Sequence, residues 1–506
     1  MICLCLTGKT IPENLRLRQT WGDRAGAFEF RGDALLETEV EGARSFLGAI
    51  EKPLILTVRR RAEGPGEARR LSRLSRLAGF LLDSPGSLEG RFVDLEEDLP
   101  PQDWEERWLS RGGKVIRSFH DFSGTPAGLT GRVRGLPRRP GEIPKAAVWP
   151  KTGEDLLQIF RTCRELEPGP RIVLGMGALG LPTRILGRKL GALFTYASAP
   201  GYSAAPGQLD PETLEDLYGF SGLSGNPRLF ALLGFPALQS LSPAIHNRGF
   251  RALGLDGVYL PLEMEDPLPF LAQAQEAGFA GFSVTHPHKE KVLPLLSFAS
   301  PQVREIGACN TLIGPGCGGY RGELSSTPGG WQGHNTDAEG FSAPLAALWG
   351  REDFHGLAAR IIGAGGAAGA AAWELKRRGA EVRLYNRSAP RAQALARRLD
   401  LSWGLLGDPP GANLPGGDLL VNATPAGLTG EDPVPGLSFD PGELVYDLTY
   451  REGGTPFLAR AQGAGCRTLG GGPMLFAQAK LQFKLFTGRE YPFPRPPWDR
   501  DAQFNS

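Results

Sequence analysis

Residues 142–150, EIPKAAVWP, contain four consecutive apolar residues, a run typical of a strand buried on both faces. Lys145 lies at the start of this run. Lysine side chains are almost never fully buried unless they are paired. Either Lys145 caps the strand in solvent, or it is kept inside the protein for its chemistry. The surrounding sequence bears on that choice.

Similar strand-like runs recur through the first 215 residues, and amphipathic segments such as EARRLSRLSRLAGFLL (67–82) alternate with them. Further helices are predicted over LPTRILGRKL (181–190) and PETLEDLYGF (211–220). Eight β–α units in this length predict a (β/α)8 barrel. The eight predicted strands are residues 2–7, 27–32, 54–59, 91–96, 114–122, 144–149, 171–177 and 192–198.

A second pattern begins after the polar, turn-rich SGLSGNPR (221–228), where new strand-like runs appear at LFALLGF, GVYLPLEM and AGFSVT. From residue 357 the chain reads strand, glycine-rich turn, helix and strand, which is the opening of a dinucleotide-binding fold. We therefore predict an α/β protein with an N-terminal (β/α)8 TIM barrel and a two-lobed second half. The predicted parts are the barrel (1–220), a linker (221–227), a substrate-binding lobe (228–340, completed by 474–506) and a Rossmann lobe (341–473).

Composition argues against several classes of partner. The 506 residues include 56 lysines and arginines against 55 aspartates and glutamates, a net charge of +1, so neither nucleic acid nor an anionic membrane is expected. The opening MICLCLTGKT has neither a basic region nor a cleavage site, and the six cysteines form no CxxC motif. We expect a soluble cytoplasmic protein with free thiols that acts on small molecules.

Polar residues cluster near the ends of the predicted barrel strands, where the reactive side chains of such barrels project. They are Glu29, Arg31, Arg59, Glu63, Asp94, Glu96, His120, Lys145, Arg184 and Gln208. One lysine at a strand end is usually a solvated cap, but a polar residue on almost every strand favours an active site.

These residues lie in motifs that resemble those of the type I 3-dehydroquinate dehydratases. The motifs are FEFRGD (28–33), TVRRRAEG (57–64), SFHDFSGTP (118–126), IPKAAVWP (143–150), GMGALGLPTRI (175–185) and SAAPGQL (203–209). The resemblance implies that Lys145 forms a Schiff base with 3-dehydroquinate, that His120 is general acid and base, and that Glu63 orients His120. It implies that Arg184 pairs with the substrate carboxylate, and that the remaining polar groups are held by Glu29, Arg31, Arg59 and Gln208. The family usually has serine four residues before the glutamine; here that position is Ala204, and Ser203 is the neighbouring candidate.

The physical chemistry of these residue types agrees with those roles. A free lysine is almost wholly protonated at neutral pH, but burial and neighbouring arginines favour the uncharged, nucleophilic amine. Once an iminium forms, the adjacent carbon–hydrogen bond becomes acidic enough for an imidazole to remove the proton. Histidine suits this task because it both takes and returns a proton near neutral pH.

The string GAGGAAGA (363–370) predicts the dinucleotide site, with Gly363, Ala364, Gly365, Gly366 and Ala367 in the turn. An NAD-specific fold places an acidic residue about 20 residues further on. This chain has Asn386, Arg387, Ser388 and Arg391 there, and two arginines without a carboxylate suit the 2′-phosphate of NADP. NADP(H) is therefore the predicted cofactor.

The second half resembles shikimate dehydrogenase through GFPALQSLSPAIHN (234–247), FSVTHPHKE (282–290), IGACNTL (306–312), GHNTDAEG (333–340), NATPAGL (422–428), VYDLTY (445–450) and GGPMLFAQ (471–478). The resemblance implies a catalytic pair of Lys289 and Asp337, with Lys289 donating a proton to the nascent alkoxide. It implies substrate contacts from Ser240, Ser242, Thr285, Asn310, Tyr450 and Gln478, and a nicotinamide side lined by Thr424, Gly472 and Met474. Ser283 stands where many bacterial members have asparagine. His286 and His288 lack a surrounding cluster with metal-ligand spacing, so no metal is expected.

The two implied reactions are consecutive, since 3-dehydroshikimate, the product of the first, is the ketone that the second reduces. Two alternatives stay open. One is a dehydrogenase that prefers quinate or NAD, and the other is a sensor or repressor built on an inactive copy of these enzymes. Against the second, the chain retains Lys145, His120, Lys289 and Asp337 and has no basic arm.

Overall fold

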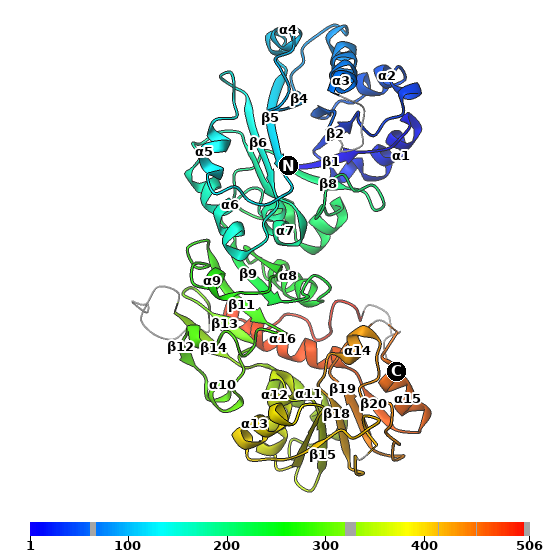
Figure 1. Cartoon of the computed structure of the whole chain (residues 1–506), viewed down its shortest axis with the longest axis vertical. Helices are drawn as coiled ribbons and strands as arrows, with labels where there is room; N and C mark the ends of the chain where they lie inside the picture. The colour runs from blue at the N-terminus through cyan, green and yellow to red at the C-terminus, as the bar shows by residue number, and fades with distance from the viewer. Residues whose placement is uncertain (61–66, 319–329, 413, 452, 500–506) are drawn as a thin grey trace. The chain divides into compact units, whose positions relative to one another are not determined.

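The structure is a computed structural model that describes residues 1–60, 67–318, 330–412, 414–451 and 453–499 (Figure 1). It divides into two compact units, residues 1–228 with 256–270 and residues 229–255 with 271–506. No helix among the described residues is long and apolar enough to cross a membrane.

The first unit contains one eight-stranded parallel sheet in the order β7-β6-β5-β4-β3-β2-β1-β8. A parallel bridge between Arg171 and Ala192, just before β7 and β8, links the two outer strands. The predicted barrel of eight parallel strands is thus confirmed. The strands are β1 (Ile2–Leu6), β2 (Ala27–Arg31), β3 (Leu54–Thr57), β4 (Arg91–Glu96), β5 (Lys114–Asp121), β6 (Ile143–Val148), β7 (Ile172–Gly175) and β8 (Thr195–Ser198).

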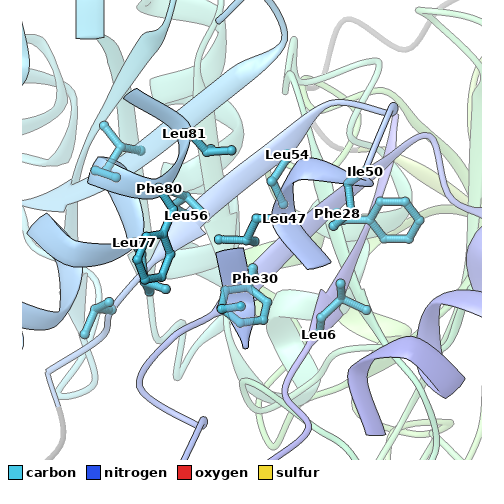
Figure 2. Close-up of a cluster of buried hydrophobic side chains, with 14 of the residues drawn as sticks. Leu6, Phe28, Phe30, Leu47, Ile50, Leu54, Leu56, Leu77, Phe80 and Leu81 are labelled. Atoms are coloured by element: carbon cyan, nitrogen blue, oxygen red, sulfur yellow. The ribbon is translucent and has the colours of Figure 1, made fainter. Parts of the chain in front are cut away.

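Helices connect these strands and cover the outer face of the sheet. In α3 the buried residues Leu74, Leu77, Ala78 and Leu81 recur at intervals of three and four and so form one apolar face. Leu77 and Leu81 of this face belong to one buried cluster with Phe30 and Leu56 of the first strands (Figure 2). The helices are α1 (Ile11–Trp21), α2 (Ala43–Gly48), α3 (Glu67–Leu82), α4 (Glu105–Ser110), α5 (Leu129–Arg134), α6 (Gly153–Glu165) and α7 (Gly177–Ile185).

The inner face of the sheet changes from apolar to polar along the strands. Because side chains alternate between faces, every second residue of a strand points inward. The early inward positions form an apolar cluster that includes Ala27, Ile55, Ile116, Ile143 and Ile172. Further along each strand, the residues that point to the same inner face include most of the polar residues named above. They are Glu29, Arg31, Asp94, Glu96, His120 and Lys145.

Three local predictions differ from the structure. The helix predicted over residues 181–190 is α7, which begins at Gly177 and ends at Ile185. It begins earlier than predicted because Gly177 adopts a left-handed conformation that starts the helix. The helix predicted over 211–220 is reduced to a short π-helical turn at Thr213–Leu217 and a 3₁₀ turn at Phe220–Gly222. Lys145 is the third residue of β6, inside the strand and not at its end.

The second half of the chain contains two six-stranded sheets. The first has the order β10-β9-β11-β13-β14-β12 and mixes parallel and antiparallel pairs. Its strands are β9 (Arg228–Gly234), β10 (Gly257–Glu263), β11 (Phe279–Val284), β12 (Leu296–Ala299), β13 (Thr311–Ile313) and β14 (Trp331–His334). The helices that accompany these strands are α8 (Ser242–Ala252), α9 (Leu268–Leu271) and α10 (Pro301–Ile306).

The second of these sheets is wholly parallel, with the order β17-β16-β15-β18-β19-β20. This is the doubly wound order of a Rossmann fold, whose ligand crevice lies where the strand order reverses, between β15 and β18. The strands are β15 (Ala358–Ile362), β16 (Glu381–Asn386), β17 (Ser402–Leu405), β18 (Leu419–Asn422), β19 (Leu444–Asp447) and β20 (Arg467–Leu469). The helices are α11 (Asp337–Trp349), α12 (Gly366–Arg377), α13 (Ala389–Leu399), α14 (Ala426–Thr429), α15 (Pro456–Gly463) and α16 (Gly471–Thr487). The α/β fold class is confirmed for both halves.

Two candidate active sites

Lys145 lies inside the barrel, with only 4% of its side chain exposed. Its Nζ is 2.7 Å from Asp94 Oδ2 and 3.8 Å from Glu29 Oε1. The same nitrogen is 4.1 Å from the centroid of the Tyr196 ring on β8, a cation–π contact. The lysine is therefore a buried, paired group and not a solvated cap, which answers the question posed by the EIPKAAVWP stretch.

Arg59 links the two carboxylates of β4. Its Nη2 is 2.9 Å from Asp94 Oδ2 and its Nη1 is 3.2 Å from Glu96 Oε1. Burial alone would raise the pKa of the Asp94 carboxyl, but the charges of Arg59 and Lys145 outweigh it and hold that pKa far below its usual value. Burial likewise opposes ionisation of Glu96, and Arg59 and His120 keep its pKa low. Both carboxylates are charged near neutral pH.

His120 on β5 faces the same cluster through its Nδ1 atom. That nitrogen is 3.1 Å from Glu96 Oε1 and 3.3 Å from Arg59 Nη1. Burial lowers the pKa of His120 to about 4, and the positive charge of Arg59 adds to this effect. The imidazole is therefore neutral at pH 7 and can accept a proton.

Arg31 and Glu29 on β2 complete one wall of the cluster. Arg31 makes a bidentate pair with Asp33, with Nε–Oδ1 and Nη2–Oδ2 distances of 3.0 Å. The Glu29 carboxylate accepts hydrogen bonds from the Thr57 hydroxyl at 2.9 Å and the Cys5 thiol at 3.1 Å. These bonds fix both side chains in place.

Gln208 lies in the loop after β8, and Arg184, on α7, contacts the same loop. Gln208 Oε1 accepts hydrogen bonds from the Ser198 hydroxyl and the Ala204 amide, and Arg184 Nη2 donates to the Pro206 carbonyl at 3.2 Å. Burial lowers the pKa of Arg184 to about 10, and no described carboxylate pairs with it. Ser203 is exposed, and its hydroxyl donates to the Ala205 carbonyl. Glu63 lies outside the described residues.

Asp94 and Glu96 are among the polar residues predicted near the strand ends, but the family resemblance gave them no role, and Tyr196 was not predicted at all. The signal for the first two was present in RFVDLE, where charged residues alternate with Val93 and Leu95 on a strand expected to be buried. Such alternation places both carboxylates on the inner face. Tyr196 carried no comparable signal, because an aromatic residue in a strand is ordinary core.

In the second half, Lys289 and Asp337 form an ion pair with an Nζ–Oδ2 distance of 2.5 Å. The Asn310 amide donates to Asp337 Oδ1 and to the Thr336 hydroxyl, each at 2.9 Å, and lies 3.5 Å from Gln478 Oε1. Asp337 is the first residue of α11, where the positive end of the helix dipole favours its negative charge. The predicted lysine, aspartate, asparagine and glutamine thus lie together.

A second group of predicted residues surrounds Ser240. Its hydroxyl is 3.2 Å from the Ser242 hydroxyl, and Tyr450 hydrogen-bonds to Ser240. Burial raises the pKa of Tyr450, and the bond to Ser240 partly offsets this. Thr285 follows β11 directly, and its amide donates to the Leu233 carbonyl at 2.8 Å. The buried Ser283 donates to Gln482 Oε1 at 2.7 Å, so its hydroxyl faces α16.

The glycine-rich turn joins β15 to α12 as predicted. Gly363 has a φ of +122°, and a Cβ there would lie 3.1 Å from the Ala423 carbonyl. A Cβ on Gly366 would lie 3.1 Å from Lys289 Cδ, so this turn passes beside the Lys289–Asp337 pair. Ala364, Gly365 and Ala367 complete the turn at the N-terminus of α12.

The remaining residues predicted to bind the dinucleotide lie around this turn in the Rossmann sheet. Arg387 and Arg391 are exposed at the end of β16 and on α13, and the Asn386 amide donates to the Ser388 carbonyl at 3.0 Å. Thr424 follows β18 and donates to Asn422 at 2.7 Å. Gly472 and the buried Met474 lie on α16. Among the described residues, no group of three or more His, Cys, Asp or Glu could hold a metal ion.

These two sites define an α/β enzyme of two parts, one built on a buried lysine and one on a dinucleotide-binding turn beside a lysine–aspartate pair. Family comparisons agree: residues 2–224 match the type I 3-dehydroquinase model and residues 232–312 match the shikimate dehydrogenase substrate-binding domain model. Through its second half the chain belongs to the shikimate dehydrogenase family, and its first half is similar to the type I 3-dehydroquinases.

Individual relatives cover different parts of the chain. The chloroplastic bifunctional 3-dehydroquinate dehydratase/shikimate dehydrogenase of Arabidopsis thaliana is 31% identical over 75% of this chain, and the match spans 64% of that protein. A shikimate dehydrogenase (NADP⁺) of Oleidesulfovibrio alaskensis is 37% identical over 53% of this chain and 92% of its own length. A shikimate 5-dehydrogenase structure from Thermus thermophilus, in complex with NADP(H) and shikimate, is 35% identical over 52% of this chain and 95% of its own, with a TM-score of 0.45.

Proposed function

We propose that this protein dehydrates 3-dehydroquinate to 3-dehydroshikimate in its barrel and reduces that product to shikimate with NADPH in its second half. The observation that carries the proposal is the buried Lys145, paired with Asp94 and set in one cluster with a neutral His120. The Lys289–Asp337 pair beside the glycine-rich turn supports the second reaction.

In the proposed dehydration, the uncharged amine of Lys145 adds to the ketone carbon, and loss of water gives an iminium. His120 removes a proton from the carbon next to the iminium. The hydroxyl on the following carbon then leaves as water, taking the proton back from the imidazole. Hydrolysis of the iminium releases the product and the free amine.

The proposed substrate contacts are assigned to polar groups that can still form hydrogen bonds or ion pairs. Arg184 has no described carboxylate partner, so it suits the substrate carboxylate. Arg31 is held by Asp33 but keeps Nη1 only weakly engaged, at 3.5 Å from the Ala204 carbonyl. The other proposed substrate contacts are Glu29, Arg59, Gln208 and Ser203. Glu63 is proposed as a catalytic residue.

In the proposed reduction, Lys289 donates its proton to the carbonyl oxygen as that oxygen gains charge, and Asp337 holds the lysine in position. Asn310 and Gln478 would bind ring hydroxyls, and Ser240, Ser242, Thr285 and Tyr450 would bind the carboxylate end and close the pocket. NADPH supplies the hydride when it is bound. The pair's contact with Gly366 sets it beside the dinucleotide turn.

The residues present fit NADPH. Gly363 has a φ of +122° that favours glycine, and the turn leads into the N-terminus of α12, where a pyrophosphate would bind. The exposed Arg387 and Arg391 would bind the 2′-phosphate, with Asn386 and Ser388 beside them. Thr424, Gly472 and Met474 would line the nicotinamide side.

We propose residues 1–220, 228–340 with 474–506, and 341–473 as the functional domains. The six buried cysteines, which form no disulfide with one another, and the balanced charge support a cytoplasmic location with small-molecule partners.

The test is an assay of purified protein with 3-dehydroquinate and NADPH, in which the enone product and the nicotinamide are followed separately. We expect enone formation without NADPH and shikimate formation only with it. Enone formation without any later NADPH oxidation would reject the reductase half, and reduction of added 3-dehydroshikimate without enone formation would reject the dehydratase half. Activity with NADH and none with NADPH would reject the cofactor assignment.

A further inference from the structure

A chain of buried hydrogen bonds connects α16 to the Lys289–Asp337 pair. Gln482 of α16 is 2% exposed, and its Nε2 donates to the Thr311 hydroxyl oxygen at 3.0 Å. The Thr311 hydroxyl donates in turn to Asn310 Oδ1 at 2.9 Å. Asn310 Nδ2 then donates to Asp337 Oδ1 at 2.9 Å, and Asp337 Oδ2 pairs with Lys289. Each donor in this chain points toward the Asp337 carboxylate, and hydrogen bonds arranged in this way strengthen one another.

The neighbours of Gln482 fix the orientation of its amide. Nε2 is also 3.2 Å from the Asn310 carbonyl oxygen, which can only accept, so the NH₂ group must lie on that side. Oε1 lies on the other side and accepts from the Ser283 hydroxyl at 2.7 Å, and the buried His246 ring also interacts with Gln482. The Asn310 carbonyl is already held within the sheet by the Val284 amide at 2.7 Å. The specific contribution of Gln482 is therefore its other bond, to the threonine hydroxyl.

That bond directs the proton of Thr311. Because the Thr311 oxygen accepts from Gln482, its own proton is directed to another acceptor, which is Asn310 Oδ1. The Thr336 amide supplies the other donor to the same oxygen at 2.8 Å. With Oδ1 held by two donors, Nδ2 faces Asp337. Loss of Gln482 would free the Thr311 hydroxyl to rotate and would leave Asn310 Oδ1 held by the Thr336 amide alone.

We propose that Gln482 is a positioning residue for the reduction, which acts through Thr311 to keep the NH₂ group of Asn310 on Asp337. This inference rests on the proposed reduction and extends it to a residue outside the predicted site. Among the hydrogen bonds and ion pairs of the described residues, Gln482 makes none with Lys289 or Asp337, so its effect passes through Asn310. The consequence is a carboxylate that keeps Lys289 in place for proton donation.

Thr311 has a second neighbour from which an amide could reach it. Ser283 is directly opposite Thr311 in the β11–β13 register, so the two side chains lie on the same face of the sheet. Directly opposite Cβ atoms are about 4.5–5.5 Å apart, which is within reach of an asparagine side chain. Serine carries no amide, and the Ser283 hydroxyl bonds to Gln482 instead. An asparagine at 283 would therefore offer Thr311, from β11, the N–H group that Gln482 offers from α16.

A mutant cycle tests whether Gln482 acts through Asn310. The variants are Gln482→Met, Asn310→Ala and the two combined, each assayed for reduction of added 3-dehydroshikimate by NADPH. Methionine has a side chain of similar length that donates no hydrogen bond. We expect kcat/KM for 3-dehydroshikimate to fall about five- to twentyfold in Gln482→Met, with KM for NADPH changed less than about twofold. The combined variant should lose no more than Asn310→Ala alone, because an effect that passes through Asn310 disappears with it.

Rescue from β11 provides a second test, because it restores the N–H group from a different element. Adding Ser283→Asn to Gln482→Ala should raise kcat/KM at least about fivefold over Gln482→Ala alone, whereas Ser283→Leu, which fills the same space without a donor, should not. Lys484→Met is the matched control, because Lys484 is exposed on α16 and pairs with Glu490, and it should leave kcat/KM unchanged. If Gln482→Met does not fold, Thr311→Val replaces it in the cycle, since valine has the shape of threonine without the hydroxyl.

Three outcomes would overturn the proposal: additive losses in the cycle, unchanged kcat/KM in Gln482→Met, or equal activity with Ser283→Asn and Ser283→Leu. Failure of the proposed function is a different result. A wild-type protein that does not reduce 3-dehydroshikimate with NADPH refutes the reductase, whereas a working reductase with additive losses refutes only the role of Gln482.

Discussion

Lys145 and Lys289 each form an ion pair with an aspartate, but the surroundings of the two pairs differ. Lys145 is 4% exposed, lies against the Tyr196 ring and shares Asp94 with Arg59. Lys289 is 17% exposed, and its partner Asp337 is held by the Asn310 amide and a helix N-terminus. Among the described residues, a second cation shares the aspartate in the barrel, and none does so at the second site.

This difference shows how a lysine–aspartate pair can support two different reactions. In the barrel, Asp94 is shared between Lys145 and Arg59, and the lysine lies buried against an aromatic ring, a setting that suits a covalent nucleophile. At the second site Asp337 forms an ion pair with Lys289 alone among the described residues, an arrangement that suits a proton donor held in place by a carboxylate. The predictions below test this contrast.

Removal of the barrel lysine has the largest expected effect. Lys145→Ala should abolish borohydride trapping and lower dehydration by about 10⁴-fold or more, since loss of a covalent nucleophile costs at least that in comparable enzymes. Reduction of added 3-dehydroshikimate should stay unchanged. Lys151→Ala is the control, because Lys151 is exposed just after β6. Trapping that persists in Lys145→Ala would reject the imine.

Removal of Lys289 should impair reduction and leave dehydration intact. Lys289→Ala should lower kcat for reduction about 10²–10³-fold with little change in KM, because a general acid contributes in this range and acts mainly in the transition state. Dehydration should be unaffected. Lys291→Ala, which changes an exposed lysine two residues on, controls for local charge. Near-wild-type kcat in Lys289→Ala would contradict its role.

The pH dependence of dehydration should report the buried imidazole. The His120 pKa of about 4 lies below its usual value, so the neutral base persists as pH falls and is lost only near pH 4. Arg59 and Lys145 lower this pKa, and Glu96 and Asp94 oppose them. At pH 5 we expect nearly full kcat/KM, about thirtyfold more than an imidazole of pKa ~6.5 would retain. A half-maximal rate near pH 6.5, in protein that regains full activity at pH 7, would contradict this.

Substitution of Arg387 should have a smaller effect than the changes above, because Arg387 and Arg391 are exposed. Arg387→Ala should raise KM for NADPH about tenfold, the cost of one charged hydrogen bond, and leave KM for NADH unchanged. Arg397→Ala removes an exposed arginine of α13, the helix that also carries Arg391, and should change neither constant. Equal losses with both cofactors would place Arg387 elsewhere than at the 2′-phosphate.

Much of the fold could be predicted from the sequence, because strands and helices depend on local patterns of residues. Every barrel strand was found, since apolar runs and their parity are local properties. The contacts that set the chemistry join distant residues: Lys145 meets Asp94 across 51 positions, and Asn310 meets Gln478 across 168. No local pattern encodes such pairs. The start of α7 was missed because it depends on the positive φ of Gly177, which the sequence permits without requiring it.

The smallest expected effect concerns Ala204, which stands where the family usually has serine. Ala204 is half-buried beside the barrel interior, its amide donates to Gln208 Oε1 at 3.0 Å, and the neighbouring Ser203 hydroxyl donates to the Ala205 carbonyl at 3.1 Å. Ala204→Ser adds a hydroxyl that Ser203 does not supply, so KM for 3-dehydroquinate should fall about two- to fivefold at constant kcat, the value of one neutral hydrogen bond. Ala205→Ser, one residue further on and also half-buried, is the control. An unchanged KM in Ala204→Ser would mean that the loop already provides this hydroxyl, and Ser203 would then be its source.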